Sequence, residues 1–587
     1  MSGEFSEAQK AFLDGLGRGV AAVRAGAAGT PPPDPGPDGV LRRAQARAIA
    51  AGGVLTREEE AKRDRHPLDI WDEMVARAQA VEYPKGLDVY RYKFHGLFQV
   101  APAQDSFMCR LRIPNGILDA HRFAAVADLA ERHAGGYAHV TTRANLQLRE
   151  IGAGHAIDVL QGLADAGLTS RGAGADNVRN ITGSPTSGID PVELIDTRPL
   201  GLALHHAILN HRELYGLPRK FNIAFDGGGS TGALEDTNDI GFSAVRVGPG
   251  RALPPGVHFR VGVGGITGHG DFTTDLGVAI APSRCVAVAM AILGVFNDEG
   301  DRTDRKRARL KYVLAGMGVP AFLAAIEARL GSALPRLALA ECEPRAPLAR
   351  GAHAGIHPQR EAGRVYAGIA LPAGRMSVAQ MRALAEIAAR RGSGELRLTV
   401  WQNVVIAGLR EGEVDDLERE LRAIGLTARP SAIRAGVVAC TGNRGCRFAA
   451  SDTKRDAVSI IEHVERTVAL DTPLNVHLTG CPHSCAQHYV GDIGLVGARI
   501  ATGDDDTIDG YHVVVGGGFG DARGLGREIA RDVPAADVPA LVERLVAAYL
   551  AHRESPRQSF AEFARGRAPG ALRAFAQPSA CDAAPSP

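Results

Sequence analysis

The hydrophobic pattern changes period several times within the first recognisable module. LRIPNG (111–116) reads as an apolar strand that ends in a Pro-x-Gly turn. Apolar residues then recur at three- and four-residue spacing, which predicts a helix after this turn. VTTRANLQL (140–148) alternates and predicts a single strand, and HAIDVLQGLADAG (155–167) predicts a second helix that ends at a glycine. The positions that carry the first helical pattern are Phe123, Val126, Ala127 and Ala130.

This pattern occurs twice. Residues 111–136 align without a gap with residues 369–394, which lie 258 positions later, and 138–148 align with 396–406 at the same offset. Order, spacing and pattern hold over about 150 residues, so an internal duplication is the simplest explanation. Later matches, at a slightly smaller offset, are KFNIAF (220–225) with PLNVHL (473–478) and DIGFSAVRV (239–247) with DIGLVGARI (492–500).

Each module predicts a strand–helix–strand–helix unit, which is half of a ferredoxin-like fold, and two copies can join into one sheet. A mixed α/β region follows each half, so the expected class is α+β. The copies differ in their charges: Arg110 lies opposite Gly368, Arg143 opposite Trp401, and Lys220 opposite Pro473, while Arg179 falls near Val437. Four closely spaced cysteines occur only in the second module, so one copy supplies cations and the other thiolates.

Composition limits the classes of function. The 587 residues need several cores, and a formal charge of +1 gives no global attraction to nucleic acid. No apolar run is long enough to cross a membrane, and the acidic N-terminus argues against a targeting peptide, so we expect a cytoplasmic protein. The predicted domains are 1–40 (a helix at about 5–23 and a Pro/Gly linker), 41–170 and 341–430 (ferredoxin-like halves), 171–340 and 431–575 (α+β domains), and 576–587 (a tail).

The clustered cysteines form a C-x5-C pair and a C-x3-C pair, separated by 34 residues. Thiolates at this density suit zinc or an iron–sulfur cluster. The first spacing is wide for a zinc knuckle. Gly442, Gly445 and Gly480 would let the backbone approach a bulky cofactor, which favours a cluster over a single ion. The four cysteines are Cys440, Cys446, Cys481 and Cys485.

At this point the sequence resembles a known family. ACTGNRGC followed by TGCPHSC and DIGLVG is similar to the signature of the sirohaem-containing nitrite and sulfite reductases. Other blocks occur in the family's order and extend the resemblance over roughly residues 85–570: FMCRLRIPNG, VTTRANLQL, DNVRN, LPRKFN, DRTDRKRARLKY and WQNVVIAG. The resemblance implies a [4Fe–4S] cluster held by Cys440, Cys446, Cys481 and Cys485, with Cys485 also bridging to the sirohaem iron.

The resemblance also implies roles for cations, since sirohaem carries many carboxylates and the substrate is an anion. Arg110, Arg179 and Lys220 correspond to substrate-side cations, with Asn222 beside them. Within RTDRKRARLKY (302–312) a solvated helix face is the simpler interpretation, although the family suggests that part of it reaches the cofactor. His483 and His488 are expected to be exposed loop residues. Implied cofactor contacts are Arg143, Arg219, Gln402 and Cys485.

The expected substrate is nitrite. LPRKFN ends in Asn222, where sulfite-reducing relatives often carry a second lysine, and a monoanion needs one cation fewer than the largely dianionic sulfite. We therefore expect six-electron reduction of nitrite to ammonium, with assimilatory sulfite reduction as the alternative. Less favoured are an enzyme similar to precorrin-3B synthase and a non-catalytic metal-binding protein.

No flavin or NAD(P)H domain is evident, so electrons should come from a separate ferredoxin. We expect a monomer that uses neither nucleic acid nor a membrane as a partner.

Overall fold

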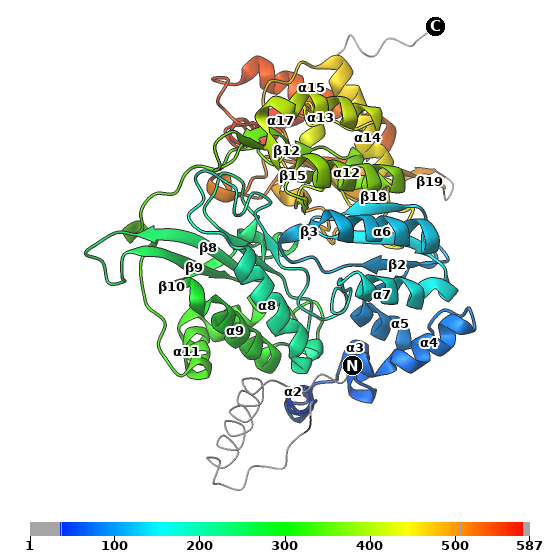
Figure 1. The fold of residues 1–587 in the computed structure, drawn as a ribbon, viewed down its shortest axis with the longest axis vertical. Coiled ribbons are helices and arrows are strands. Elements are labelled where there is room, and N and C mark those ends of the chain that lie inside the picture. Colours follow the sequence, from blue (N-terminus) through cyan, green and yellow to red (C-terminus); the bar gives the residue numbers. More distant parts are fainter. Residues whose placement is uncertain (1–35, 37, 504–505, 579–587) are drawn as a thin grey trace, which may run out of the picture.

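The computed structural model describes residue 36 and residues 38–503 and 506–578. The helix predicted at about 5–23 lies outside the described residues. The strands of the described chain, β1 to β20, form four five-stranded sheets, and helices cover them, as Figure 1 shows. The helices are α2 (Gly39–Ala50), α3 (Arg57–Asp64), α4 (Trp71–Gln79), α5 (Asp88–Arg91), α6 (Ala120–His133), α7 (Ala156–Asp165), α8 (Arg198–Asn210), α9 (Cys285–Glu299), α10 (Leu310–Met317), α11 (Val319–Leu330), α12 (Val378–Arg391), α13 (Val414–Ala423), α14 (Thr453–Thr467), α15 (Val538–His552), α16 (Phe560–Arg565) and α17 (Pro569–Ala576).

The two ferredoxin-like halves build two sheets, and each half lends a strand to the other's sheet. The expectation of one joined sheet is therefore wrong: β13 pairs with β4 and β3 pairs with β14, both antiparallel. One sheet has the order β1 (Leu97–Gln99), β2 (Phe107–Arg110), β5 (Leu146–Ile151), β4 (Tyr137–Val140), β13 (Arg375–Ser377). The other has the order β11 (Gly355–Pro358), β12 (Arg364–Ile369), β15 (Val404–Arg410), β14 (Glu395–Leu398), β3 (Ile117–Asp119).

The predicted helices of the halves are confirmed. Asp119 caps α6 by accepting a hydrogen bond from the backbone of Arg122, and Ser377 caps α12 in a capping box with Gln380. The helices α6 and α12 pack together, and one apolar core runs through both halves. Gly167, just beyond α7, has a φ of 67°, as a C-terminal glycine should.

VTTRANLQL, predicted as one strand, is instead the end of β4, a tight turn and the start of β5. Within the turn, the Thr141 amide donates to the Asn145 carbonyl at 2.9 Å, and Ala144 has a φ of 47°. Alternating sequence could not reveal a turn built from threonine and asparagine side chains. The copy in the second module turns in the same way at residues 399–403, with Gln402 at a φ of 62°.

The two remaining sheets share one topology: three parallel strands followed by two antiparallel ones. Each packs on its own apolar core. The first has the order β10 (Thr274–Ile280), β9 (Gly256–Val263), β8 (Ile240–Val247), β7 (Ile223–Asp226), β6 (Thr182–Gly183). The second has the order β16 (Val437–Ala439), β17 (Val476–Thr479), β18 (Ile493–Gly503), β19 (Asp506–Val515), β20 (Arg527–Pro534).

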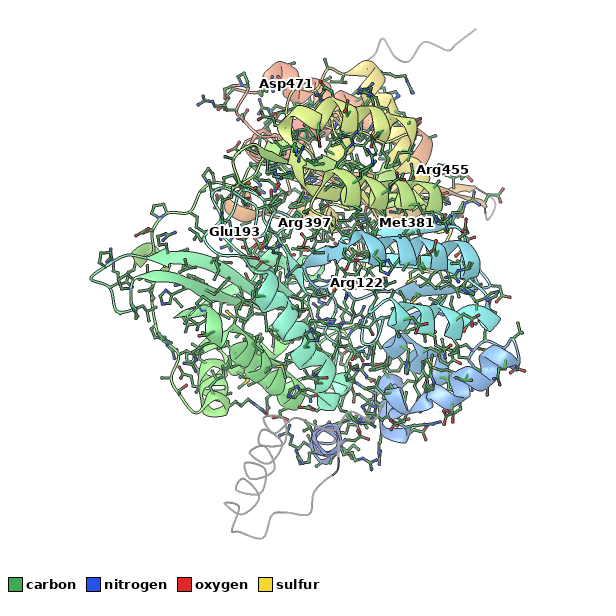
Figure 2. All side chains as sticks on the ribbon, viewed as in Figure 1. Arg122, Glu193, Met381, Arg397, Arg455 and Asp471 are labelled. Carbon is green, nitrogen blue, oxygen red and sulfur yellow. The ribbon has the colours of Figure 1, made fainter. Side chains whose placement is uncertain are left out.

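Buried arginines join the modules. Arg397, labelled in Figure 2 beside Glu193, donates to the carbonyls of Pro185 at 3.1 Å and Ser187 at 2.7 Å. Glu193 accepts from the Ser187 hydroxyl at 2.8 Å, so both side chains hold the same loop. Among the described residues no helix is long and apolar enough to cross a membrane alone. Only the bent pair α10 and α11 satisfies that test, and only when taken together.

Candidate functional site

The four clustered cysteines lie in two loops at one edge of the β16–β20 sheet. Cys440 directly follows β16, and Cys481 follows β17 after one residue. Because β16 and β17 are parallel neighbours, their carboxyl ends lie side by side. The Cys440 amide donates to the Leu478 carbonyl at 3.0 Å, and the Gly480 amide donates to the Cys440 sulfur at 3.2 Å. The fold therefore brings the two pairs together.

The four cysteines form a set of thiols that could bind metal. None of the four forms a disulfide. Four thiolates suit either a single zinc ion or a polynuclear iron–sulfur group.

The electrostatics of the bare thiols favour a bound metal group at this place. Burial, reinforced by the neighbouring thiolates, raises the pKa of Cys481 to about 11. Burial also raises the pKa of Cys485, against the opposing effect of Lys220 and Arg110. Four thiolates in one place are unfavourable unless a multiply charged metal group compensates them.

The glycines of these loops have a packing reason of their own. A Cβ at Gly445 would come within 2.1 Å of the Arg149 guanidinium, and one at Gly480 within 2.6 Å of the Ala449 side chain. Gly442 has a φ of 74°. The nearest atoms belong to the protein, so close approach to a cofactor stays a prediction for these positions.

The five predicted arginines and lysines come from separate elements and converge. Arg110 ends β2, Arg143 lies in the β4–β5 turn, Arg179 precedes β6, and Arg219 and Lys220 precede β7. Each keeps some accessible surface, yet desolvation is the largest influence on the pKa of each, and it lowers that pKa. Burial therefore disfavours the charged form of each of these side chains.

The group also faces Cys485. The thiolate of Cys485 opposes the loss of the proton from both Arg110 and Lys220. The Thr142 hydroxyl, in the β4–β5 turn, donates to the Cys485 carbonyl at 2.9 Å. Arg110 also lies 4.8 Å from the centre of the Phe98 ring. Arg110 and Lys220 of the first module therefore lie near the Cys485 thiol of the second, and their role at a bound substrate stays a prediction.

Two buried carboxylates, which the sequence did not single out, neutralise part of this charge. Asp176 accepts two hydrogen bonds from Arg305, at 2.8 and 2.9 Å, and Tyr90 donates to it at 2.6 Å. Asp239 accepts from Arg309 Nη2 at 2.7 Å. The nearby cations hold the pKa of Asp176 far below its usual range, although burial opposes them. The sequence signal that could have revealed Asp176 is its place as the first residue of the DNVRN block.

The basic segment 302–312 is not a solvated helix face, and that interpretation is wrong. Residues 301–309 form turns, and α10 begins at Leu310. Arg302 and Arg309 are 2% and 3% exposed, and Arg302 donates to Glu59 at 2.9 Å. A run of charges gives no sign of burial when its partners lie far away in the sequence.

Cations remain after this pairing. Arg179 is satisfied only by backbone carbonyls, Ala175 at 2.6 Å and Ala173 at 3.3 Å, and Arg143 donates to Asn238 Oδ1 at 2.8 Å. The buried Nε atoms of both arginines have no partner in the described chain. No described residue accepts a hydrogen bond from Lys220, and burial, followed by repulsion from Arg309, lowers its pKa to about 7. Such a surplus fits an anionic ligand that carries several acceptors.

Gln402 has a different use from the predicted one. Its amide donates to the Ala439 carbonyl at 2.9 Å and accepts from the Ala439 amide at 2.9 Å, so both ends are engaged beside Cys440. The side chain is 4% exposed. Gln402 therefore positions the edge of β16, and its contact with a macrocycle stays a prediction.

Asn222 belongs to the shared scaffold. Its backbone amide donates to Asp239 at 2.8 Å, and in the second module the amide of Asn475 donates to Asp492 at the same distance. The copy without the cations repeats this arrangement, but the bond comes from the backbone, so it does not by itself require asparagine at position 222. A role for its side chain in substrate choice stays a prediction.

The two histidines of the C-x3-C loop differ in burial. His483 is exposed, as expected, and its Nδ1 lies 3.3 Å from the Cys481 sulfur. His488 has no exposed surface, so the expectation of an exposed residue is wrong. It packs beneath β18, where burial lowers its pKa to about 4. The short helical turn that follows Gln487, whose φ is 55°, directs it inward.

Comparison with known proteins supports the family resemblance that the sequence motifs indicate. The family model described as nitrite/sulfite reductase ferredoxin-like half domain matches residues 101–166 and 357–424. The model described as nitrite and sulphite reductase 4Fe-4S domain matches residues 174–334 and 432–560. The alternation of two half domains with two 4Fe-4S domains confirms the α+β, duplicated architecture.

Individual relatives cover most of the chain. A ferredoxin–nitrite reductase of Synechococcus elongatus is 34% identical over 521 residues, which are 85% of this chain and 98% of the relative. An assimilatory ferredoxin-dependent nitrite reductase of Haloferax mediterranei is 30% identical over 557 residues, 90% of this chain and 94% of the relative. The structure of the Mycobacterium tuberculosis NirA protein superposes with a TM-score of 0.82 at 26% identity, covering 90% of this chain and 99% of that one. The chain belongs to the nitrite and sulfite reductase family of oxidoreductases, whose 4Fe-4S domain implies an iron–sulfur cluster.

Proposed function

We propose that the protein reduces nitrite to ammonium with six electrons from ferredoxin, using a [4Fe–4S] cluster and sirohaem. The balance is one nitrite, six electrons and eight protons, which give one ammonium and two waters. The observation that carries the proposal is the surplus of buried cations from the first module beside the Cys485 thiol of the second. The relatives in Synechococcus elongatus and Haloferax mediterranei, described as ferredoxin-dependent, support the choice of donor.

The residues present fit both groups. Cys440, Cys446, Cys481 and Cys485 would hold the cluster, and Cys485 would be shared with the sirohaem iron. Arg143, Arg179 and Lys220 each keep part of their surface accessible, and no described carboxylate forms an ion pair with any of the three. Arg143 and Arg219 would bind sirohaem carboxylates, and the Arg guanidinium suits such a planar acceptor. When bound, sirohaem supplies an iron atom at which the nitrogen of nitrite is reduced.

The protein's own contribution is charge and protons. Arg110, Arg179 and Lys220 would orient the anion and stabilise the negative charge that develops as its N–O bonds break. A lysine with a pKa near 7 is suited to giving up a proton at neutral pH. A bound anion would raise this pKa and keep Lys220 charged for as long as the anion lies beside it.

The test is a comparison of specificity constants. The holoenzyme, purified without oxygen, should show a strong haem absorption band and, with reduced ferredoxin or methyl viologen, a higher kcat/KM for nitrite than for sulfite. A higher value for sulfite would establish the alternative, sulfite reduction to sulfide, on the same architecture. Protein that lacks haem absorption after reconstitution with iron and sirohaem would overturn the proposal.

A further inference from the structure

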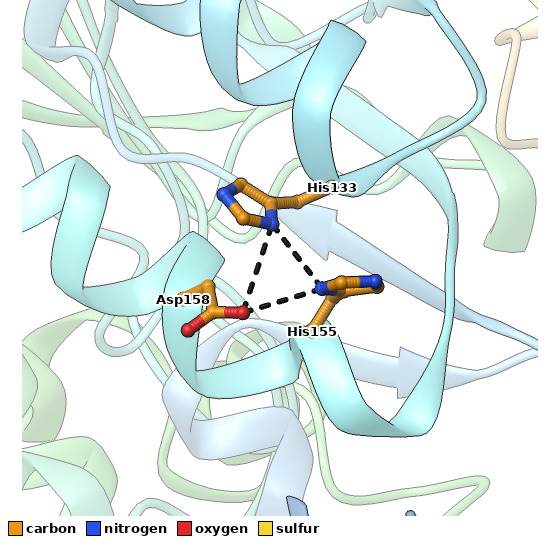
Figure 3. A group of neighbouring side chains, drawn as sticks. All are labelled: His133, His155 and Asp158. Atoms are coloured by element: carbon orange, nitrogen blue, oxygen red, sulfur yellow. Dashed lines mark hydrogen bonds and ion pairs between the residues drawn. The ribbon is translucent and has the colours of Figure 1, made fainter.

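A second group of metal-ligating side chains lies on the surface of the first ferredoxin-like half. His133 is the last residue of α6, His155 immediately precedes α7, and Asp158 lies in the first turn of α7. Figure 3 shows the three side chains pointing toward one another. His133 Nδ1 lies 3.2 Å from His155 Nδ1, which lies 3.2 Å from Asp158 Oδ2, and the third side of the triangle is 3.6 Å. The cluster cysteines and the converging cations described above contribute nothing to this group.

We propose that His133, His155 and Asp158 form a binding site for one Zn²⁺ ion. In a tetrahedral zinc site, bonds of about 2.0–2.2 Å place neighbouring nitrogen and oxygen ligands about 3.3–3.5 Å apart. The observed sides lie within about 0.2 Å of that range. An ion about 2.05 Å from all three atoms would stand about 0.7 Å above their plane, as a tetrahedral centre does above its base, which leaves a fourth position for water.

The charge of the group suits a cation. Asp158 supplies a negative charge, and burial, the largest influence, lowers the pKa of His133, which favours the neutral imidazole that binds metal. Arg132 lies next to His133 and opposes a cation, as does the N-terminus of α7, while the C-terminus of α6 attracts one. The side chains of His133, His155 and Asp158 are 22%, 53% and 48% exposed, so an ion can enter from solvent without unfolding.

Without a metal, the three side chains cannot form hydrogen bonds along all three sides of this triangle. Each Nδ1 carries at most one proton, and a carboxylate carries none, so two neutral histidines leave at least one of the three short contacts without a hydrogen bond. Protonation of both rings would fill the contacts with Asp158 but would set two positive charges against each other. One ion satisfies all three lone pairs at once.

Zinc at this place would tie the end of α6 to the start of α7. The intervening residues contain β4 and β5, and with them the turn that carries Arg143. The ion would therefore stabilise this half of the molecule, by an amount that grows with the ratio of zinc concentration to the dissociation constant.

The experiment uses the tag-free holoenzyme with its iron–sulfur cluster and sirohaem loaded. Protein is equilibrated with about 10 μM buffered Zn²⁺, as suits a three-ligand surface site, separated from unbound metal, and analysed for zinc per chain. We expect one zinc in the wild type and at least tenfold weaker retention in His155→Ala and in Asp158→Asn. His121→Ala is the matched control and should retain zinc, because His121 lies on the exposed face of α6, the helix that ends at His133. Asp158→His, which restores a third donor, should retain it as well.

X-ray absorption at the zinc edge identifies the ligands. We expect nitrogen and oxygen neighbours at about 2.0–2.1 Å, and a higher thermal unfolding midpoint with zinc in the wild type but not in His155→Ala. Three results would each overturn the proposal: no zinc retained by the wild type, equal retention by His155→Ala and Asp158→Asn, or sulfur neighbours at about 2.3 Å, which would place the zinc at cysteines.

Discussion

Replacing Gln402 with alanine should loosen the cluster site without touching a cysteine. Gln402 closes the outer edge of β16 through two hydrogen bonds of 2.9 Å to the backbone of Ala439, and Cys440 is the next residue. The side chain is 4% exposed, so water does not readily replace the lost partners. Gln402→Ala leaves one N–H and one C=O of Ala439 unpaired.

The magnitude follows from those two groups. An unsatisfied buried polar group costs about 1–3 kcal/mol, so the pair costs about 2–6 kcal/mol. The left-handed backbone at residue 402, with a φ of 62°, persists in the alanine variant, so no strain is relieved to offset this cost. The loss falls on the strand that positions Cys440, and we expect iron to be released to a chelator at least tenfold faster than from the wild type.

The assay combines iron release, followed by the absorbance of an iron chelator, with denaturant unfolding of the holoenzyme. Gln380→Ala is the matched control, because Gln380 also bonds to backbone groups but lies in the cap of α12, away from the cysteines. It should leave iron release unchanged. Wild-type iron release and stability in Gln402→Ala would refute the reasoning. A changed haem spectrum with normal cluster retention would instead favour the predicted contact with the macrocycle.

Three further predictions concern buried charge. Lys220→Ala should leave cluster and haem absorption nearly unchanged and lower nitrite turnover at least tenfold, measured with reduced methyl viologen; unchanged turnover would remove Lys220 from the proposed mechanism. Asp176→Asn should lose about 3–5 kcal/mol in denaturant unfolding, because Arg305, Lys62 and Arg219 lose their shared counter-charge, and a wild-type midpoint would contradict that role. His488 has a pKa of about 4 when folded and about 6.5 when unfolded. It therefore binds its proton more readily in the unfolded chain, and stability should fall as the pH drops from about 6.5 toward 4, by up to about 1.4 kcal/mol per pH unit. His488→Leu should reduce that slope, and equal slopes for wild type and variant would disprove the assignment.

The sequence was most informative where chemistry depends on local spacing. The two cysteine pairs, the duplicated helices and the cations that the second module lacks were all visible in the order of residues. The structure supports their convergence because Cys440 and Cys481 follow neighbouring parallel strands and because Thr142 of the first module bonds to the backbone of Cys485.

What the sequence could not show depends on partners distant along the chain. Asp176 and Arg305 are 129 positions apart, and neither is unusual until the fold pairs them. The turn that presents Arg143 alternates like a strand, and only its side-chain hydrogen bonds reveal it. His488 looks like a loop residue because the backbone reversal at Gln487 has no glycine to announce it.

The exchange of strands β3 and β13 between the two ferredoxin-like halves suggests how this molecule arose. Two identical ancestral chains that exchanged one strand each would have formed an intertwined twofold dimer, and joining their genes would have turned an association between molecules into a contact within one polypeptide. After that fusion each copy could change without affecting a symmetric twin. One half could then lose its thiols and the other its positive charges, an asymmetry that a homodimer cannot evolve.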